Sequence, residues 1–172
     1  FGMINIIIII LLLLLIYLLV STNIPFLIKQ LLFIILTIIF GLLLSNIIHD
    51  SDKKLVKGAI VSTIINFFVM FVLGLIIVYY NYDLSWMGIF LFVGLLSLIT
   101  ISFTSIFLKG ESYNNTQKFL TISSIIIFSL YILYDTNVIL LKLNNNNNDC
   151  IKGALAYYLD IINLFTSYLD NN

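Results

Sequence analysis

This chain of 172 residues is poor in charge, and it contains no arginine at all. Charged residues make up 9% of it, the formal net charge is zero, and it has one proline and one cysteine. A neutral chain offers no basic surface for nucleic acid, and one cysteine excludes an internal disulfide. Because 62% of the residues are hydrophobic, the composition lies outside the range of soluble domains and indicates a membrane protein.

Hydrophobic runs of about 20 residues recur along the chain, as expected for membrane-spanning helices. Strands are excluded as spans because the runs do not alternate between polar and apolar residues, and an open sheet cannot satisfy its backbone in lipid. Short connections make consecutive helices antiparallel neighbours. The sequence therefore predicts an all-α, multi-pass membrane protein: one helical bundle domain over residues 1–172, with spans near 4–20, 25–48, 56–80, 84–108, 119–141 and 151–169.

The compartment depends on the host. We expect the endoplasmic reticulum or another endomembrane if the protein is eukaryotic or viral, and the plasma membrane if it is bacterial. The lysines of the connections are divided five to three between the two sides, which is weak evidence for an orientation. Membrane orientation therefore stays open.

Only two acidic residues, Asp135 and Asp160, lie deep inside the hydrophobic segments, and no basic residue accompanies them there. The other six acids fall in polar connections or at the end of the chain. An ionised carboxylate inside a bilayer costs at least about 2.5 kcal/mol, so such a residue usually marks a path for ions or protons. The two aspartates are the predicted functional residues.

Both aspartates are predicted to lie at nearly the same depth in the membrane. Asp135 precedes Lys142 by seven residues, and Asp160 follows Lys152 by eight. At a rise of about 1.5 Å per residue, they lie roughly 10 and 12 Å from the same surface, on neighbouring antiparallel helices. This arithmetic does not determine whether they face each other.

If the two carboxylates do face each other, burial and like charge both disfavour the doubly ionised state. The pair would then share a proton and titrate as one unit, acting as an ion and proton sensor. Loss of the proton leaves two close anions that separate or bind a hard cation such as Ca²⁺. Asn163 lies on the same helical face as Asp160 and could add an oxygen ligand, whereas Asn137 points elsewhere than Asp135. In the alternative reading, each aspartate is protonated and only hydrogen-bonds to a neighbouring helix.

Three further polar residues bear on the interpretation. Asn66, in the middle of the third span, needs a partner in lipid, either through an interhelical hydrogen bond or as part of a pore lining. Tyr134 directly precedes Asp135 and is taken with Asn66 and Asn163 as a supporting polar residue. His49, beside Asp50 at a helix end, is an interfacial residue or, alternatively, a pH sensor.

The segments around the two aspartates resemble a known family. Residues 131–137 (YILYDTN) and 153–165 (GALAYYLDIINLF) are similar to the signatures of the transmembrane Bax inhibitor motif family, which includes the Bax inhibitor and lifeguard-like proteins. Residues 87–94 (MGIFLFVG) look like the fifth helix of that family. The resemblance implies that the six spans are helices two to seven of a seven-helix fold, with the first helix absent from this chain.

The resemblance also implies a function, namely a pH-sensitive Ca²⁺ leak linked to Ca²⁺ homeostasis and suppression of cell death. In the family an aspartate pair in the last two helices is the sensor and gate, and the matching positions are Asp135 and Asp160. Some members use an arginine in an early helix to latch the pair, and this chain has no arginine. The expected partners are therefore the lipid bilayer, Ca²⁺ and H⁺, with membrane-bound apoptosis regulators as further candidates and no nucleic acid. No cofactor is expected beyond Ca²⁺ as a transported or transiently bound ion.

Two alternatives compete with the leak. One is a non-transporting membrane protein that suppresses apoptosis by binding other proteins. The other is an intramembrane aspartyl protease, since such enzymes also use two aspartates on adjacent helices. The bulky residues 157–159 (YYL) before Asp160 and the lack of a proline after it argue against a protease. The sequence therefore favours a protein that is not an enzyme.

Overall fold

The computed structural model describes residues 3–20, 24–107, 109–144 and 150–171. In these ranges all regular secondary structure is helical, which confirms the predicted fold class. Each predicted span corresponds to one helix. The helices are α1 (Met3–Val20), α2 (Phe26–Asp50), α3 (Lys53–Tyr79), α4 (Met87–Ser105), α5 (Gly110–Asn144) and α6 (Cys150–Asp170).

Contacts divide the chain into two compact units, which are described separately. Unit 1 comprises residues 1–52 and 149–155, and unit 2 comprises residues 53–148 and 156–172. The first turns of α6 thus belong to unit 1 and the remainder to unit 2. The prediction of one bundle domain over the whole chain stays a prediction.

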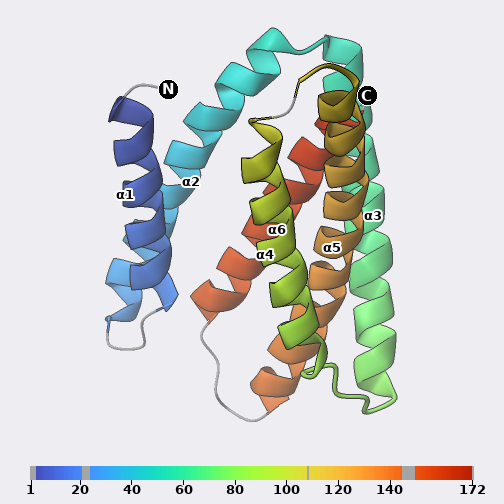
Figure 1. The fold of residues 1–172 in the computed structure, drawn as a ribbon. Helices are drawn as coiled ribbons and strands as arrows, with labels where there is room; N and C mark the ends of the chain where they lie inside the picture. Colours follow the sequence, from blue (N-terminus) through green and yellow to red (C-terminus); the bar gives the residue numbers. More distant parts are fainter. Residues whose placement is uncertain (1–2, 21–23, 108, 145–149, 172) are drawn as a thin grey trace. The chain divides into compact units, whose positions relative to one another are not determined.

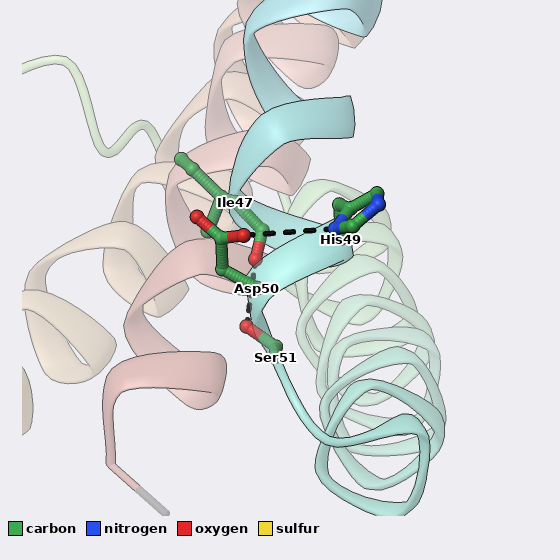
Figure 2. Close-up of polar contacts among 4 residues, drawn as sticks. All are labelled: Ile47, His49, Asp50 and Ser51. Carbon is green, nitrogen blue, oxygen red and sulfur yellow. Dashed lines mark hydrogen bonds and ion pairs between the residues drawn. The ribbon is translucent and has the colours of Figure 1, made fainter.

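In unit 1, α1 packs against α2. Leu19 of α1 and Leu36 of α2 are fully buried. The end of α2 is polar and exposed (Figure 2): the Ser51 hydroxyl donates to the Ile47 carbonyl at 2.7 Å, and His49 Nδ1 lies 3.6 Å from Asp50 Oδ1. Because the two side chains of this ion pair are almost fully exposed, the pair adds little stability.

In unit 2, α5 packs against both α3 and α4, and these three helices run side by side in Figure 1 (orange, green and yellow-green). The approach to α3 depends on Gly74, because a Cβ atom built there would lie 2.7 Å from the Thr136 Cβ. At Gly88 of α4 a Cβ would lie 2.6 Å from the Tyr134 hydroxyl oxygen, which is the end of a side chain and can shift. In a membrane no hydrophobic effect drives helices together, so they associate through close van der Waals packing, which small residues permit.

Helix α5 begins at Gly110, about nine residues before the predicted span at 119. The additional turns are polar, so the hydrophobic pattern that defines a span does not detect them. Gly110 has φ +64°, a left-handed conformation that glycine adopts readily. Glu111 lies in the first turn, where a negative charge is favoured by the helix dipole.

Four of the described helices are long and apolar enough to cross a membrane: α2, α3, α4 and the stretch of α5 from Gly110 to Leu141. Many side chains of α2, α3 and α4 are exposed apolar groups, as expected for helices that face lipid. This establishes a multi-pass membrane protein. The spans at α1 and α6 stay predictions; α6 has its polar residues collected on one side.

Candidate functional site

The structure brings the two predicted aspartates together within unit 2. Asp135 on α5 and Asp160 on α6 are joined through a hydrogen bond between their side chains. Asp160 is only 5% exposed. The two residues for which the flanking lysines predict a similar depth are therefore neighbours across α5 and α6, with their carboxyl groups facing each other.

The protonation state of this pair follows from its hydrogen bonding. Oδ2 of Asp160 is buried and receives no hydrogen from a donor group in the described part of the chain. Two ionised carboxylates have only acceptor atoms, so a hydrogen bond between Asp135 and Asp160 requires that one of them carries a proton. The hydrogen bond to Asp135 leaves Oδ2 of Asp160 without a partner, and a negative charge on this buried oxygen would be costly.

The pair lies in a cleft of about 1110 Å³ between α4, α5 and α6. We call it the aspartate cleft. Its walls combine apolar side chains with a row of polar ones, and none of the described residues that line it is basic. The polar side chains from α4 and α5 include Ser102, Ser105, Gln117, Thr121, Ser124 and Asp135. Those from α6 are Asp160, Asn163, Ser167 and Asp170.

Asn163 lines the aspartate cleft, as expected for a residue one turn after Asp160. Its amide nitrogen donates to the Leu159 carbonyl of its own helix at 2.8 Å, so its amide oxygen is the atom available to a ligand in the cleft. Tyr131 also lines the cleft. Sequence reasoning missed Tyr131, although it precedes Asp135 by four residues and therefore shares its helical face.

Asn66 forms interhelical hydrogen bonds, the first of the two roles that the sequence left open. Its amide nitrogen donates to the Ser129 hydroxyl of α5 at 2.9 Å and to the Tyr168 hydroxyl of α6 at 2.8 Å. The three side chains also line a smaller cavity of about 460 Å³. We call them the Asn66 node, and it links α3, α5 and α6 through polar contacts inside the membrane segments.

Asn137 points away from the pair, as predicted, and has a structural role. It is fully buried. Its side-chain oxygen accepts from the Leu84 backbone N–H at 2.9 Å, and its nitrogen donates to the Tyr82 carbonyl at 2.8 Å. Asn137 therefore anchors the α3–α4 connection to α5. Tyr134 is also directed away from the cleft, because its hydroxyl lies over Gly88 of α4.

Tyr157 is a second residue that the sequence reasoning missed. Its hydroxyl donates to the Thr136 hydroxyl at 2.9 Å, and its ring makes edge contacts with Phe67 and Phe71 of α3. Thr136 adjoins Asp135 in the chain. Tyr157 therefore joins α6 to α5 close to the pair.

One further acid, Asp83, lies outside the membrane segments, in the α3–α4 connection. The Ser85 hydroxyl and backbone N–H donate to its Oδ1 at 2.5 and 2.7 Å. The side-chain hydrogen bond and then the backbone one lower the pKa of Asp83, since both favour the charged form. Because it is fully exposed and is not among the residues that line the cleft, Asp83 is a useful reference acid.

The possible Ca²⁺ ligands in the described chain are Asp135 and Asp160, with Asn163 beside them. No group of three or more His, Cys, Asp or Glu side chains suited to a metal ion occurs among the described residues. A bound Ca²⁺ would therefore have to complete its six to eight oxygen ligands with amide oxygens, hydroxyls and water.

Comparisons with known proteins agree with the resemblance of the motifs. Residues 1–170 match the family described as inhibitor of apoptosis-promoting Bax1. The chain is 33% identical to protein LIFEGUARD 1 of Arabidopsis thaliana over 119 residues, which cover 69% of this chain and 49% of that protein.

Two bacterial proteins are also similar. The chain is 39% identical over 90 residues to an uncharacterized protein of Campylobacter jejuni, and 37% identical over 89 residues to an uncharacterized membrane protein of Vibrio cholerae. Each match covers 51% of this chain and 36% of the relative. The matched residues therefore span about half or less of these relatives.

Proposed function

This chain belongs to the Bax inhibitor family, and from that premise we propose that it is a pH-sensitive Ca²⁺ leak protein gated by the Asp135–Asp160 pair. The observation that carries the proposal is the hydrogen bond between the buried carboxyl group of Asp160 and the partly buried one of Asp135, in a cleft whose described lining residues include no basic one. Such an arrangement responds both to protons and to cations, because only these can neutralise the pair.

The proposed mechanism has two states. With one proton on the pair, the hydrogen bond between Asp135 and Asp160 holds α6 against α5 and the protein is closed. When the proton is lost, two neighbouring anions, one of them buried, repel each other and favour separation of the helices. In the separated state, carboxylate oxygens and the Asn163 amide oxygen can bind a passing Ca²⁺, which prefers such ligands.

The sign of the pH dependence follows directly. Lower pH favours the protonated, hydrogen-bonded state and a low flux, and higher pH favours the separated state and a high flux. The arginine latch of some family members has no counterpart here, since the chain has no arginine. In this protein the gate would therefore depend on the shared proton and on contacts such as Tyr157–Thr136.

The direct test is Ca²⁺ flux into liposomes that contain the purified protein, measured with a trapped dye from acidic to mildly alkaline pH. We expect the wild-type flux to rise with pH by on the order of tenfold, as a minor open state becomes populated. Asp135→Asn and Asp160→Asn should each abolish this rise, because an amide cannot lose the proton. Asp83→Asn is the matched control and should retain it, since Asp83 is exposed and outside the cleft.

Unchanged pH dependence in both cleft variants would contradict the gate, and no flux in any sample would contradict the leak. The same variants address the alternative of a non-transporting protein that suppresses apoptosis through membrane partners. Protection of cells that survives the double variant Asp135→Asn/Asp160→Asn would favour that alternative.

The proposal also states that the protein is not an enzyme. A hydrogen-bonded aspartate pair is the catalytic arrangement of aspartic proteases as well, so the distinction requires a measurement. The purified protein should leave a model transmembrane peptide intact over long incubation. Cleavage that disappears in Asp160→Asn would overturn this part of the proposal.

A further inference from the structure

One side of α6 carries a regular row of polar residues that extends from the aspartate pair to the end of the helix. Asp160, Asn163, Ser167 and Asp170 follow one another at intervals of three, four and three residues, and all four line the aspartate cleft. These intervals place them on one helical face. At about 1.5 Å per residue the row is roughly 15 Å long.

The α5 wall of the cleft carries Tyr131 and Phe128 next to Asp135 and becomes polar further along the helix. Ser124, Thr121 and Gln117 of α5 line it at increasing distance along the chain from Asp135. At the far end, the Gln117 amide donates to the Ser105 hydroxyl at 3.1 Å and so joins α5 to α4. The C-terminal end of α6 and the first turns of α5 lie at the same end of unit 2 (Figure 1).

Two independent observations indicate that this space holds water and cations. The first is Asp160, which lines the cleft and is only 5% exposed. Its buried Oδ2 accepts no hydrogen bond from any described residue. The second is the charge of the lining: its described residues carry the carboxyl groups of Asp135, Asp160 and Asp170 and include no lysine or histidine. Ionisable residues at membrane depth face a bundle interior or a water-filled cavity. Acids without bases attract cations into such a cavity.

We propose that the aspartate cleft is a hydrated cation path between the Asp135–Asp160 pair and the C-terminal end of α6, with Asp170 as the carboxylate that collects cations at its outer end. This inference rests on the proposed leak and adds its route, its ligand class and an outer residue. Asp170 is suited to the role because it lines the cleft and is exposed at the helix end. The ligand class is a hydrated divalent cation bound through oxygen atoms.

The hydration of the path can be tested without any flux measurement. The chain has one cysteine, Cys150, so Cys150→Ser provides a background without thiols. On that background Ser167→Cys is a nearly isosteric probe inside the cleft, and Ile161→Cys is the matched control on the same helix outside the lining. Both are treated with a positively charged, membrane-impermeant thiol reagent in proteoliposomes.

We expect the Ser167→Cys protein to react at least about tenfold faster than the Ile161→Cys protein, because the reagent needs water and a cation-attracting path. Millimolar Ca²⁺ should slow the reaction at position 167 and leave position 161 unchanged. Equal rates at the two positions would overturn the inference even if Ca²⁺ flux is present. Fast reaction with protection by Ca²⁺ but no flux would support the path and contradict the leak.

The role of Asp170 needs a separate pair of variants. Asp170→Asn should raise the Ca²⁺ concentration for half-maximal flux by about threefold to tenfold at low ionic strength, with a smaller effect in high salt. Asp170→Glu should restore the wild-type value, and the pH dependence should be unchanged in both, since the gate is elsewhere. If the Asp170→Asn protein has the wild-type dependence of flux on Ca²⁺ concentration, Asp170 does not collect cations for the path.

Discussion

At the scale of single residues, Gly74 leaves the space in which α3 and α5 approach each other. A Cβ atom at this position would lie 2.7 Å from the Cβ and 2.8 Å from the Cγ2 of Thr136, and 3.3 Å from the Leu133 carbonyl oxygen. The Thr136 Cβ is bonded directly to the helix backbone and cannot rotate away. A methyl group at position 74 therefore requires the two helices to separate.

We expect Gly74→Ala to lower the free energy of unfolding by about 1–3 kcal/mol, the usual effect of overpacking a well-packed core. The measurement is unfolding in mixed detergent micelles followed by circular dichroism. Gly58→Ala in the same helix is the control, because nothing lies within 4 Å of its added Cβ. That change should be neutral or stabilise by up to about 1 kcal/mol through helix propensity. Equal stability of the two variants would contradict the close approach at Gly74.

The chemistry of Asp160 depends on the groups that surround its carboxyl group. Its side chain is buried, and its Oδ2 has no donor in the described structure. The sequence indicated that a carboxyl group lies in the membrane segment but not which atoms surround it. The structure adds these surroundings, namely Asp135 and the cleft lining, and the proposed shared proton rests on them.

At the scale of elements, α5 organises unit 2, and one side chain fixes the connection that precedes α4. Asn137 is bonded through both ends of its amide to the backbone of Tyr82 and Leu84. Within this connection Asn81 adopts φ 59°, a left-handed conformation that asparagine tolerates better than most residues. The turn therefore depends on its own sequence and on a side chain about 55 residues later.

Replacement of Asn137 by Ala should free this connection. Two backbone groups would lose their partners, and the variant should be less stable by about 1–3 kcal/mol. Hydrogen exchange at the Leu84 amide, followed by mass spectrometry, should accelerate relative to wild type. Asn114→Ala, on an exposed part of the same helix, is the control and should leave both values unchanged. Unaltered exchange in Asn137→Ala would show that the connection is held by other contacts.

At the scale of the whole unit 2, helices from distant parts of the chain are joined by polar contacts as well as by packing. The Asn66 node links α3 to α5 across 63 residues and to α6 across 102 residues. In lipid such contacts resist separation, since a freed amide would have no water to bond to. The node thus helps to hold α6, the helix that carries Asp160, in the unit.

A double-mutant cycle with Asn66→Ala and Tyr168→Phe measures this link. Each single change should destabilise the protein, and the coupling energy between them should be about 0.6 kcal/mol, the typical value for interhelical hydrogen bonds in membranes. Asn66→Ala should also shift the pH dependence of Ca²⁺ flux, if α6 moves during gating. Strict additivity of the two changes would contradict a direct hydrogen bond between them.

The sequence by itself determined the features that depend on solvent and spacing. Long apolar runs must be helical in a bilayer, because each backbone group must be satisfied within its own segment, and so the helices could be located to within a few residues. The exception is α5, whose polar first turns carry no hydrophobic signal. Helical rise and the flanking lysines alone predict a similar depth for Asp135 and Asp160, and that depth stays a prediction.

Only the tertiary structure decided which side chains meet, because interhelical contacts depend on the rotation of each helix about its axis, and spacing along the chain does not specify it. The rotation of α6 brings Asp160 to Asp135 and aligns Asn163, Ser167 and Asp170 along one cleft. The rotation of α5 turns Asn137 and Tyr134 away from that cleft, although they are neighbours of Asp135 in sequence. Two acids in lipid were visible in the sequence; the hydrogen bond between them and the path that leads away from it are properties of the packed helices.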